Sequence, residues 1–222
     1  MLVISLPQRF QTVNELSALN AGVRLLPYAL FAPIGSLFSN IIFMRKQKPL
    51  LLLLTGACFQ IIGLALLVSE SVGPTIPAKI YGYEILAGFG VGITFGTLVT
   101  ITPASVEPRD LAAATGAMIQ FRQMGGAIGL SIGSSLLNSY LKNHLAPPVL
   151  TPKQLSTLLG NVRSIFNLPP ELQRVARETF EGAYGLQLKV VVGFAAALFP
   201  SILLMVKITK SQGRFHRLAG PE

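Results

Sequence analysis

Residues 50–69 read LLLLLTGACFQIIGLALLVS, a run without a single charged side chain. The hydrocarbon core of a bilayer is about 30 Å thick, and roughly 20 apolar helical residues are needed to cross it. Comparable apolar stretches recur at 22–43, 81–102, 112–140 and 189–206, with polar connectors between them. A backbone in lipid must satisfy its own hydrogen bonds, so each stretch is predicted to be a helix. The sequence therefore predicts an all-α, polytopic transmembrane helix bundle of about five spans.

The composition agrees with this class, since 51% of the residues are hydrophobic and only 12% are charged, against about 25% charged in soluble domains. The net charge of +9 is concentrated at helix ends, where Arg45, Lys46 and Lys48 follow the first span and further basic residues occupy 207–222. Such clusters are typical of cytoplasmic loops and argue against nucleic-acid binding. The tail is therefore expected in the cytoplasm.

The connectors divide the chain into five parts: 1–21, 22–140 with four spans, 141–188, 189–206 with the last span, and the tail 207–222. An odd number of spans places the two ends of the chain on opposite sides of the membrane. The start of the chain is apolar only over its first six residues, which is too short for a signal peptide.

The segment 141–188 is too polar to cross a bilayer, yet its apolar residues follow helical spacing. We interpret it as two short amphipathic helices that lie on the non-cytoplasmic membrane face and are separated at Pro169 and Pro170. A soluble partner-binding module is the alternative.

Glycines recur every fourth residue in the third and fourth spans: Gly88, Gly92 and Gly96, and then Gly125, Gly129 and Gly133. Residues four apart share a helix face, so each set forms a flat stripe on which another helix backbone can lie closely. We expect both stripes to pack tightly, either on each other or on another helix.

No catalytic motif, nucleophile–base pair or metal-ligand spacing is visible, and the single cysteine, Cys58, lies inside a span. The sequence therefore predicts neither an enzyme nor a cofactor or metal site. The informative residues are polar groups at membrane depth, which usually mark a substrate or ion path.

Arg122 lies well inside the fourth span, flanked by Gln120 and Gln123. Because a buried arginine is costly in lipid, it should face a cavity or a partner. Two interpretations are open: a contact on a substrate or proton path, or a side chain that reaches back to the cytoplasmic surface.

Glu84 lies near the start of the third span, beside Tyr81 and Tyr83, which mark the membrane interface. A carboxylate here either belongs to a proton path or is exposed and stabilised by the helix N-terminus. The second interpretation is preferred from the sequence.

Three stretches resemble one family. They are LPQRFQ at 6–11 with SALNAGVRLLP at 17–27, the stretch 35–49 that ends in RKQKP, and 116–129 with its FRQMGG. The first resembles the start of a late helix in the fourteen-span fungal drug:proton antiporters of the major facilitator superfamily. The second resembles that group's second gating-loop motif, and the third resembles its penultimate helix.

The resemblance implies that the five spans correspond to the last five of fourteen, so the fold is a partial C-terminal half of a facilitator. Residues 1–6 would be the tail of a preceding helix. Gly35, Arg45, Lys46 and Lys48 would form a cytoplasmic gating loop. The partners implied are the lipid bilayer and, in a complete transporter, small amphiphilic molecules and protons.

The function implied is a C-terminal fragment of a proton-coupled multidrug or toxin exporter, unable to transport without an N-terminal half. The plasma membrane is the expected location, with the vacuolar membrane as the alternative. A non-transporting scaffold or partner subunit that docks through the glycine stripes is the competing hypothesis.

Overall fold

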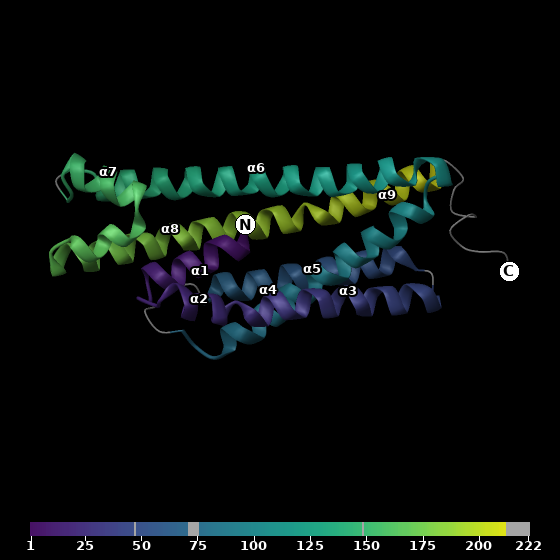
Figure 1. Ribbon diagram of the computed structural model, residues 1–222, viewed down its shortest axis with the longest axis horizontal. Helices are drawn as coiled ribbons and strands as arrows, with labels where there is room; N and C mark the ends of the chain where they lie inside the picture. The colour runs from purple at the N-terminus through teal and green to yellow at the C-terminus, as the bar shows by residue number, and fades with distance from the viewer. Residues whose placement is uncertain (47, 71–75, 148, 212–222) are drawn as a thin grey trace.

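The computed structural model describes residues 1–46, 48–70, 76–147 and 149–211 and is helical along most of them (Figure 1). No strand occurs in these ranges, so the prediction of an all-α bundle is confirmed. The α-helices in chain order are α1 (Leu2–Thr12), α2 (Ala18–Arg24), α3 (Leu26–Lys46), α4 (Pro49–Ser69), α5 (Lys79–Ala104), α6 (Leu111–Leu145), α7 (Pro152–Gly160), α8 (Pro170–Ala196) and α9 (Leu198–Ser211). Two 3-10 turns, η1 (Pro108–Asp110) and η2 (Val162–Asn167), precede α6 and follow α7.

Four stretches of the described helices are long and apolar enough to cross a membrane: Ala18–Arg45, Pro49–Ser69, Lys79–Ala104 and Pro170–Met205. They contain the first, second and third predicted spans, and the last predicted span except for its final residue. The fourth predicted span lies in α6, which is 35 residues long but is made more polar by Gln120, Arg122 and Gln123. At 1.5 Å per residue α6 measures about 52 Å, so it is longer than a bilayer core.

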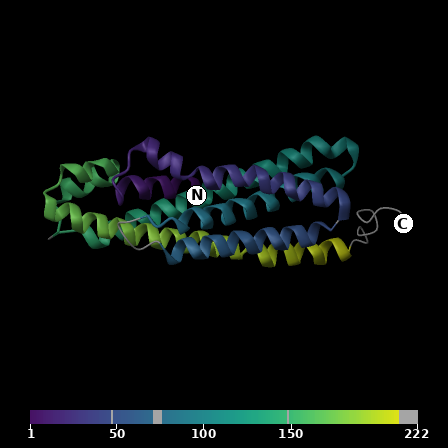
Figure 2. The same ribbon diagram turned by 90° about the horizontal axis from the view of Figure 1, so that it is seen from below.

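The helix α5 lies between α3 and α4, as Figure 2 shows, and packs closely on both, whereas α3 and α4 have little contact with each other. Glycines make this arrangement possible. A β-carbon added at Gly92 would lie 2.0 Å from the carbonyl oxygen of Ala32 in α3, and one at Gly88 would lie 2.4 Å from the carbonyl oxygen of Tyr28. On the other side of α5, a β-carbon at Gly90 would lie 2.3 Å from a backbone nitrogen of α4.

Hydroxyl groups join α3 to α5 where the glycines bring the two backbones together. The hydroxyl of Thr97 lies 3.3 Å from that of Ser39, and the hydroxyl of Thr100 lies 2.5 Å from Oδ1 of Asn40. Hydrogen bonds between helices are a common supplement to small-residue packing in membranes. The pair α3–α5 is therefore fixed by both contact and polar bonding.

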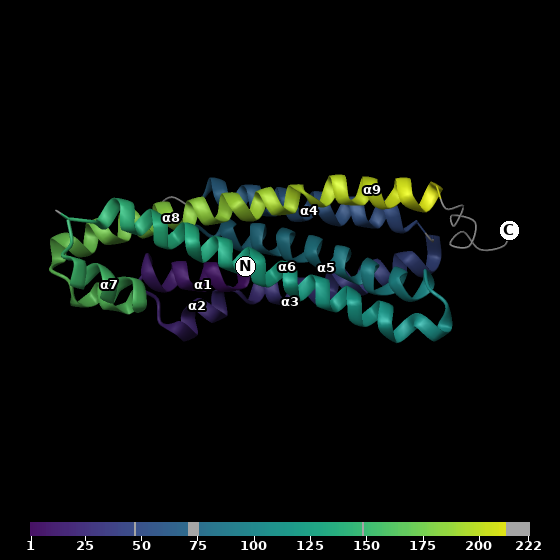
Figure 3. The same ribbon diagram turned by 90° about the horizontal axis from the view of Figure 1, so that it is seen from above.

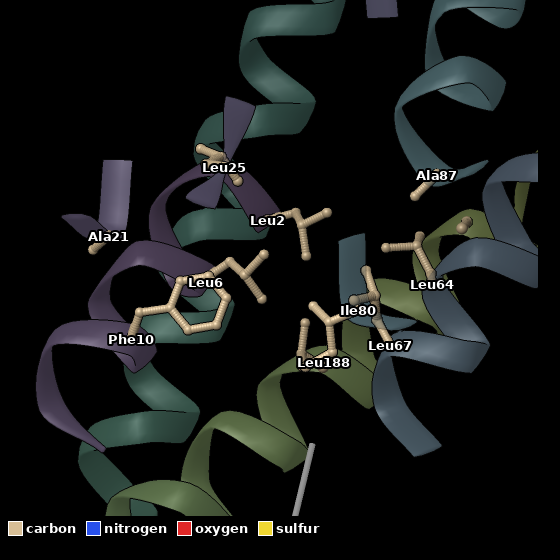
Figure 4. Close-up of a cluster of buried hydrophobic side chains, with 11 residues drawn as sticks. Leu2, Leu6, Phe10, Ala21, Leu25, Leu64, Leu67, Ile80, Ala87 and Leu188 are labelled. Carbon is tan, nitrogen blue, oxygen red and sulfur yellow. The ribbon is translucent and has the colours of Figure 1, made fainter. Parts of the chain in front are cut away.

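A first apolar cluster joins α1 and α2 to the spans. Its members come from α1, α2, α4, α5 and α8, and Figure 4 shows Leu6 and Phe10 of α1 directed toward Leu188 of α8 and Ile80 of α5. Leu6 and Phe10 are almost completely buried. The start of the chain thus packs as a short helix against the bundle.

The helices α6 and α8 run side by side and extend beyond α3–α5 toward α7, as Figure 1 shows. A second apolar cluster fills this end; its buried members are Val13, Leu141, Leu145, Leu150, Leu158, Ile165, Leu168, Ala176, Phe180, Ala183 and Tyr184. These side chains form a core shared by α6, α7, η2 and α8.

The structure corrects the description of 141–188 as two separate helices. The first is α7, and α8 does begin at Pro170, but α8 then continues to Ala196 into the last predicted span. The interruption falls at Ala197, between α8 and α9. The apolar face of this stretch turns toward α6 and α7, where Ala176 and Phe180 are buried. It is therefore covered by protein, which explains how an amphipathic segment can continue a membrane helix.

The basic connectors lie at one end of the bundle. In Figures 1 and 3 the α3–α4 connection, the α5–α6 connection with Arg109, and the end of α9 gather at the end opposite α7. Figure 3 also shows α9 along α4, and the two helices are in contact. This clustering is what the charge bias of cytoplasmic loops requires.

We expect single cysteines in a Cys58→Ala background to report this topology. Ser156→Cys in α7 and Arg174→Cys in α8 should react with a membrane-impermeant maleimide in intact cells, because both positions are exposed at the α7 end. Arg109→Cys, also exposed, is the control and should react only after permeabilisation. The reverse pattern would invert the topology.

Candidate functional site

A hollow of about 660 Å³ opens between α4, α5, α6 and the first residue of α9. It is lined by Gln60, Phe95, Leu98, Met118, Phe121, Arg122, Gly125 and Leu198. Sites for drug-sized molecules have volumes of roughly 300–1,000 Å³ and combine apolar walls with a few polar groups. The size and lining of this hollow match that description.

Arg122 extends from α6 toward α5. Its guanidinium carbon lies 4.2 Å from the centroid of the Phe95 ring, within the range of a cation–π contact. In the part of the chain that the structure describes, Arg122 has no carboxylate within 4 Å. The cation is therefore held against an aromatic face at the hollow, with its N–H groups available to a further acceptor.

Gln120 and Gln123, the predicted neighbours of Arg122, are exposed on other faces of α6 and do not line the hollow. Gln60 is there instead. It is the twelfth of the 21 residues of α4, so it lies near the middle of a plainly apolar helix. The sequence reasoning missed Gln60 and Phe95, although a lone amide in mid-span is itself a signal.

Glu84 is completely buried on α5, and neither carboxylate oxygen has a hydrogen-bond partner among the described residues. It shares a helix face with Ile80 and Ala87, one turn to either side, and both belong to the first apolar cluster. The preferred interpretation of Glu84 as an exposed carboxylate is wrong. Three residues earlier on α5, the hydroxyl of Tyr81 accepts a hydrogen bond of 3.0 Å from Arg24.

Arg45 and Lys48, two of the predicted gating-loop residues, lie at the α3–α4 connection, and Gly35 lies apart from them. Gly35 is buried in the middle of α3, where an added β-carbon would lie 2.3 Å from the carbonyl oxygen of Phe89. Arg45 is exposed near the end of α3 and Lys48 is exposed just before α4. The side chain of Lys46 lies outside the described part.

The two glycine stripes have different surroundings. Gly88, Gly92 and Gly96 lie against α3, as described above. In α6, Gly125 and Gly129 have no described atom within 4 Å of an added β-carbon, whereas Gly133 meets Met1 and Gln187. Gly129 and Gly133 are nevertheless buried, so the described residues leave only the Gly125 end of the α6 stripe exposed.

No group of three histidine, cysteine, aspartate or glutamate side chains that could hold a metal ion occurs within the described ranges. Among the buried and lining polar groups of the described residues, we take the hollow with Arg122 and the carboxyl of Glu84 as the candidate site.

Comparison with known proteins gives consistent results. The chain is 36% identical over 206 residues to the MFS-type transporter FPY5 of Fusarium mangiferae, covering 92% of this chain and 34% of the relative. It is 27% identical over 207 residues to the multidrug resistance protein fnx1 of Schizosaccharomyces pombe, covering 90% and 39%. It is 33% identical over 160 residues to the efflux pump DEP3 of Alternaria brassicicola, covering 71% and 28%.

The chain belongs to the major facilitator superfamily. This facilitator chain is an integral membrane protein, and it spans about a third of the length of the curated relatives it matches. No family model matches it. No solved structure matches it either.

Proposed function

We propose that this facilitator chain forms one helix bundle of a proton-coupled exporter of small amphiphilic molecules in the plasma membrane or the vacuolar membrane. Relatives named as a multidrug resistance protein and an efflux pump support the direction of transport. The hollow beside Arg122 supports a drug-sized substrate.

The observation that carries the proposal is the buried carboxyl of Glu84. Its oxygens have no partner among the described residues, and an isolated carboxylate away from water is costly. Binding a proton removes the charge, so Glu84 can exist in two states whose relative stability depends on proton supply. Ionisable residues inside membrane helices commonly form proton relays.

Transport in this proposal needs a second bundle. Facilitators bind substrate between two halves and alternate access by rocking one half against the other. Outside the hollow, α3 and α6 carry large exposed apolar side chains, among them Leu30, Leu37 and Ile128. An N-terminal half, in a longer chain or in another molecule, is the partner that we propose for part of this surface.

An efflux assay in a host without its own drug exporters tests the proposal. We expect the 222-residue chain alone to give no proton-dependent efflux above an empty vector. Joining it to the two thirds of FPY5 that it does not match should give proton-dependent efflux. Efflux by the purified chain in liposomes, or a chimera that inserts in the membrane without exporting, would contradict the proposal.

The exposed Gly125 end of the α6 stripe favours the second candidate, a scaffold subunit that docks another membrane helix without transporting. In that case the chain should migrate as a defined complex in native electrophoresis. Gly125→Leu should then dissociate the complex, and the chimera should not export.

A further inference from the structure

We propose that the hollow between α4, α5, α6 and α9 binds an amphiphilic organic anion, with an aromatic or apolar body and a carboxylate held by Arg122. This inference rests on the proposed export function, because it names the substrate class of the same site.

The guanidinium of Arg122 makes an aromatic contact but leaves its hydrogen-bond donors unbonded among the described residues. Its carbon lies over the Phe95 ring, 4.2 Å from the ring centroid, which holds the group beside the ring. Its five N–H donors make no hydrogen bond to a described residue, whereas Arg24 and Arg177 each donate to a side chain. A planar guanidinium that lies over a ring and has unbonded N–H groups is suited to hold a carboxylate through two parallel hydrogen bonds.

The charges around the hollow favour an anion over a cation. Arg122 is the charged member of the lining, and no carboxylate contributes to it. Glu84 lies 11 residues from Phe95 along α5, which is about 16 Å at 1.5 Å per residue. It is buried in the part of α5 that contributes to the first apolar cluster. A bound cation would therefore meet only Arg122, whereas a bound anion would be attracted to it.

The walls of the hollow suit an aromatic body. Phe121 is 72% exposed on α6, and Met118 and Leu98 lie beside it in the lining. Aromatic rings and a flexible thioether adapt to varied apolar shapes. The volume of about 660 Å³ is enough for a drug-sized molecule.

The depth of the hollow strengthens the charge preference. Gln60 lines it from near the middle of α4, so the site lies at about half the length of a predicted membrane span. Electrostatic attraction is stronger where water is scarce. The amide of Gln60 supplies a further donor or acceptor on the wall facing α6.

A matched set of probes tests this inference on the purified chain in nanodiscs of zwitterionic phosphatidylcholine. The probes are 2-naphthylacetate, 2-naphthylethanol and 2-(2-naphthyl)ethylammonium, which share a ring and differ in charge. Dissociation constants are measured by calorimetry, with empty nanodiscs as the reference for partition into lipid. We expect the acid to bind about tenfold more tightly than the ammonium, since charge-assisted bidentate bonds are among the strong ones.

Two variants assign the preference to Arg122. Arg122→Gln should remove the preference for the acid over the ammonium. Arg122→Lys should keep this preference but reduce it several-fold, because the lysine ammonium group is not planar and cannot form two parallel hydrogen bonds to a carboxylate. Arg174→Gln, at an exposed position of α8 away from the hollow, is the control and should leave the preference intact. Circular dichroism confirms that each variant is folded.

Three outcomes would overturn the inference: binding of no probe, equal binding of all three, or a preference that survives Arg122→Gln. Adding phosphatidylglycerol to the nanodiscs separates a soluble acid from a lipid headgroup. Retained naphthylacetate binding supports the inference, and complete displacement by that lipid overturns it. The measurement involves no transport, so failure of the proposed export function in the efflux assay stays distinguishable from failure of the anion site.

Discussion

Gly92→Ala is expected to destabilise the chain strongly, although alanine is the better helix former. The added β-carbon would lie 2.0 Å from the carbonyl oxygen of Ala32 and 3.0 Å from the backbone nitrogen of Ser36. These are backbone atoms of α3 and cannot rotate away, so the two helices must separate. Overpacking of this kind costs about 1–3 kcal/mol and occasionally more, and we expect the upper end because Ser39 and Thr97 also lose their hydrogen bond.

The matched control is Gly129→Ala in α6, where no described atom lies within 4 Å of an added β-carbon. This substitution should be neutral or should stabilise α6 by up to about 1 kcal/mol, the helix-propensity difference between glycine and alanine. The measurement is thermal unfolding in detergent, followed by circular dichroism. Equal shifts for Gly92→Ala and Gly129→Ala would contradict the packing of α5 on α3.

The glycine stripe of α5 could be predicted from spacing alone, but its partner could not. Positions four apart identify a face of a helix and leave open which neighbour occupies that face. The stripe of α6 has the same spacing, yet the structure leaves Gly125 uncovered. A second small-residue contact, that of Gly90 with α4, does not belong to the stripe and emerges only when α5 is seen between two helices.

The spans themselves were largely predictable, because length and apolarity decide them. Two helices are exceptions. The predicted span in α6 is not among the four stretches that are long and apolar enough to cross a membrane, and in α8 polar and apolar halves form one helix. Up to about Leu188 the buried side chains of α8 pack on protein rather than on lipid. The hydropathy of the sequence therefore places a boundary inside a helix that is continuous in the structure. A span boundary in the sequence marks a change of surroundings, not an end of the helix.

Only part of the candidate site could be predicted from the sequence. Arg122 stands out because an arginine within an apolar stretch is costly. Its neighbours in the sequence, Gln120 and Gln123, lie on other helix faces, whereas Phe95 and Gln60 reach the hollow from α5 and α4. A site assembled from several helices depends on how they pack, which no single stretch of sequence records.

The position of Glu84 shows the same limit. Tyr81 and Tyr83 mark an interface, and a carboxylate one position further on is easily read as exposed. The apolar cluster at this level of α5 includes Leu2, Leu6 and Phe10 of α1, a helix of 11 residues that the sequence alone does not connect to α5. The burial of Glu84 is therefore a tertiary effect.

Glu84→Gln is expected to uncouple export from protons in the chimera that contains an upstream half. Glutamine keeps the shape of the side chain but cannot take up or release a proton. Coupling between two ligands typically changes affinity by roughly 5–150-fold, so we expect proton-driven substrate accumulation to fall by about tenfold or more. Exchange of labelled for unlabelled substrate needs no net proton movement, and it should continue.

A merely structural role for Glu84 predicts a different pattern. If the carboxyl only filled space, Glu84→Gln would leave the proton dependence of efflux unchanged. Because the native oxygens have no partner among the described residues, removing the charge should not lower the unfolding temperature and is expected to raise it slightly. Glu107→Gln, at an exposed carboxylate 3.0 Å from Arg109 in the α5–α6 connector, is the matched control and should pump normally. Retention of proton-driven accumulation by Glu84→Gln, in a chimera that folds and exchanges substrate, would remove Glu84 from the proton path.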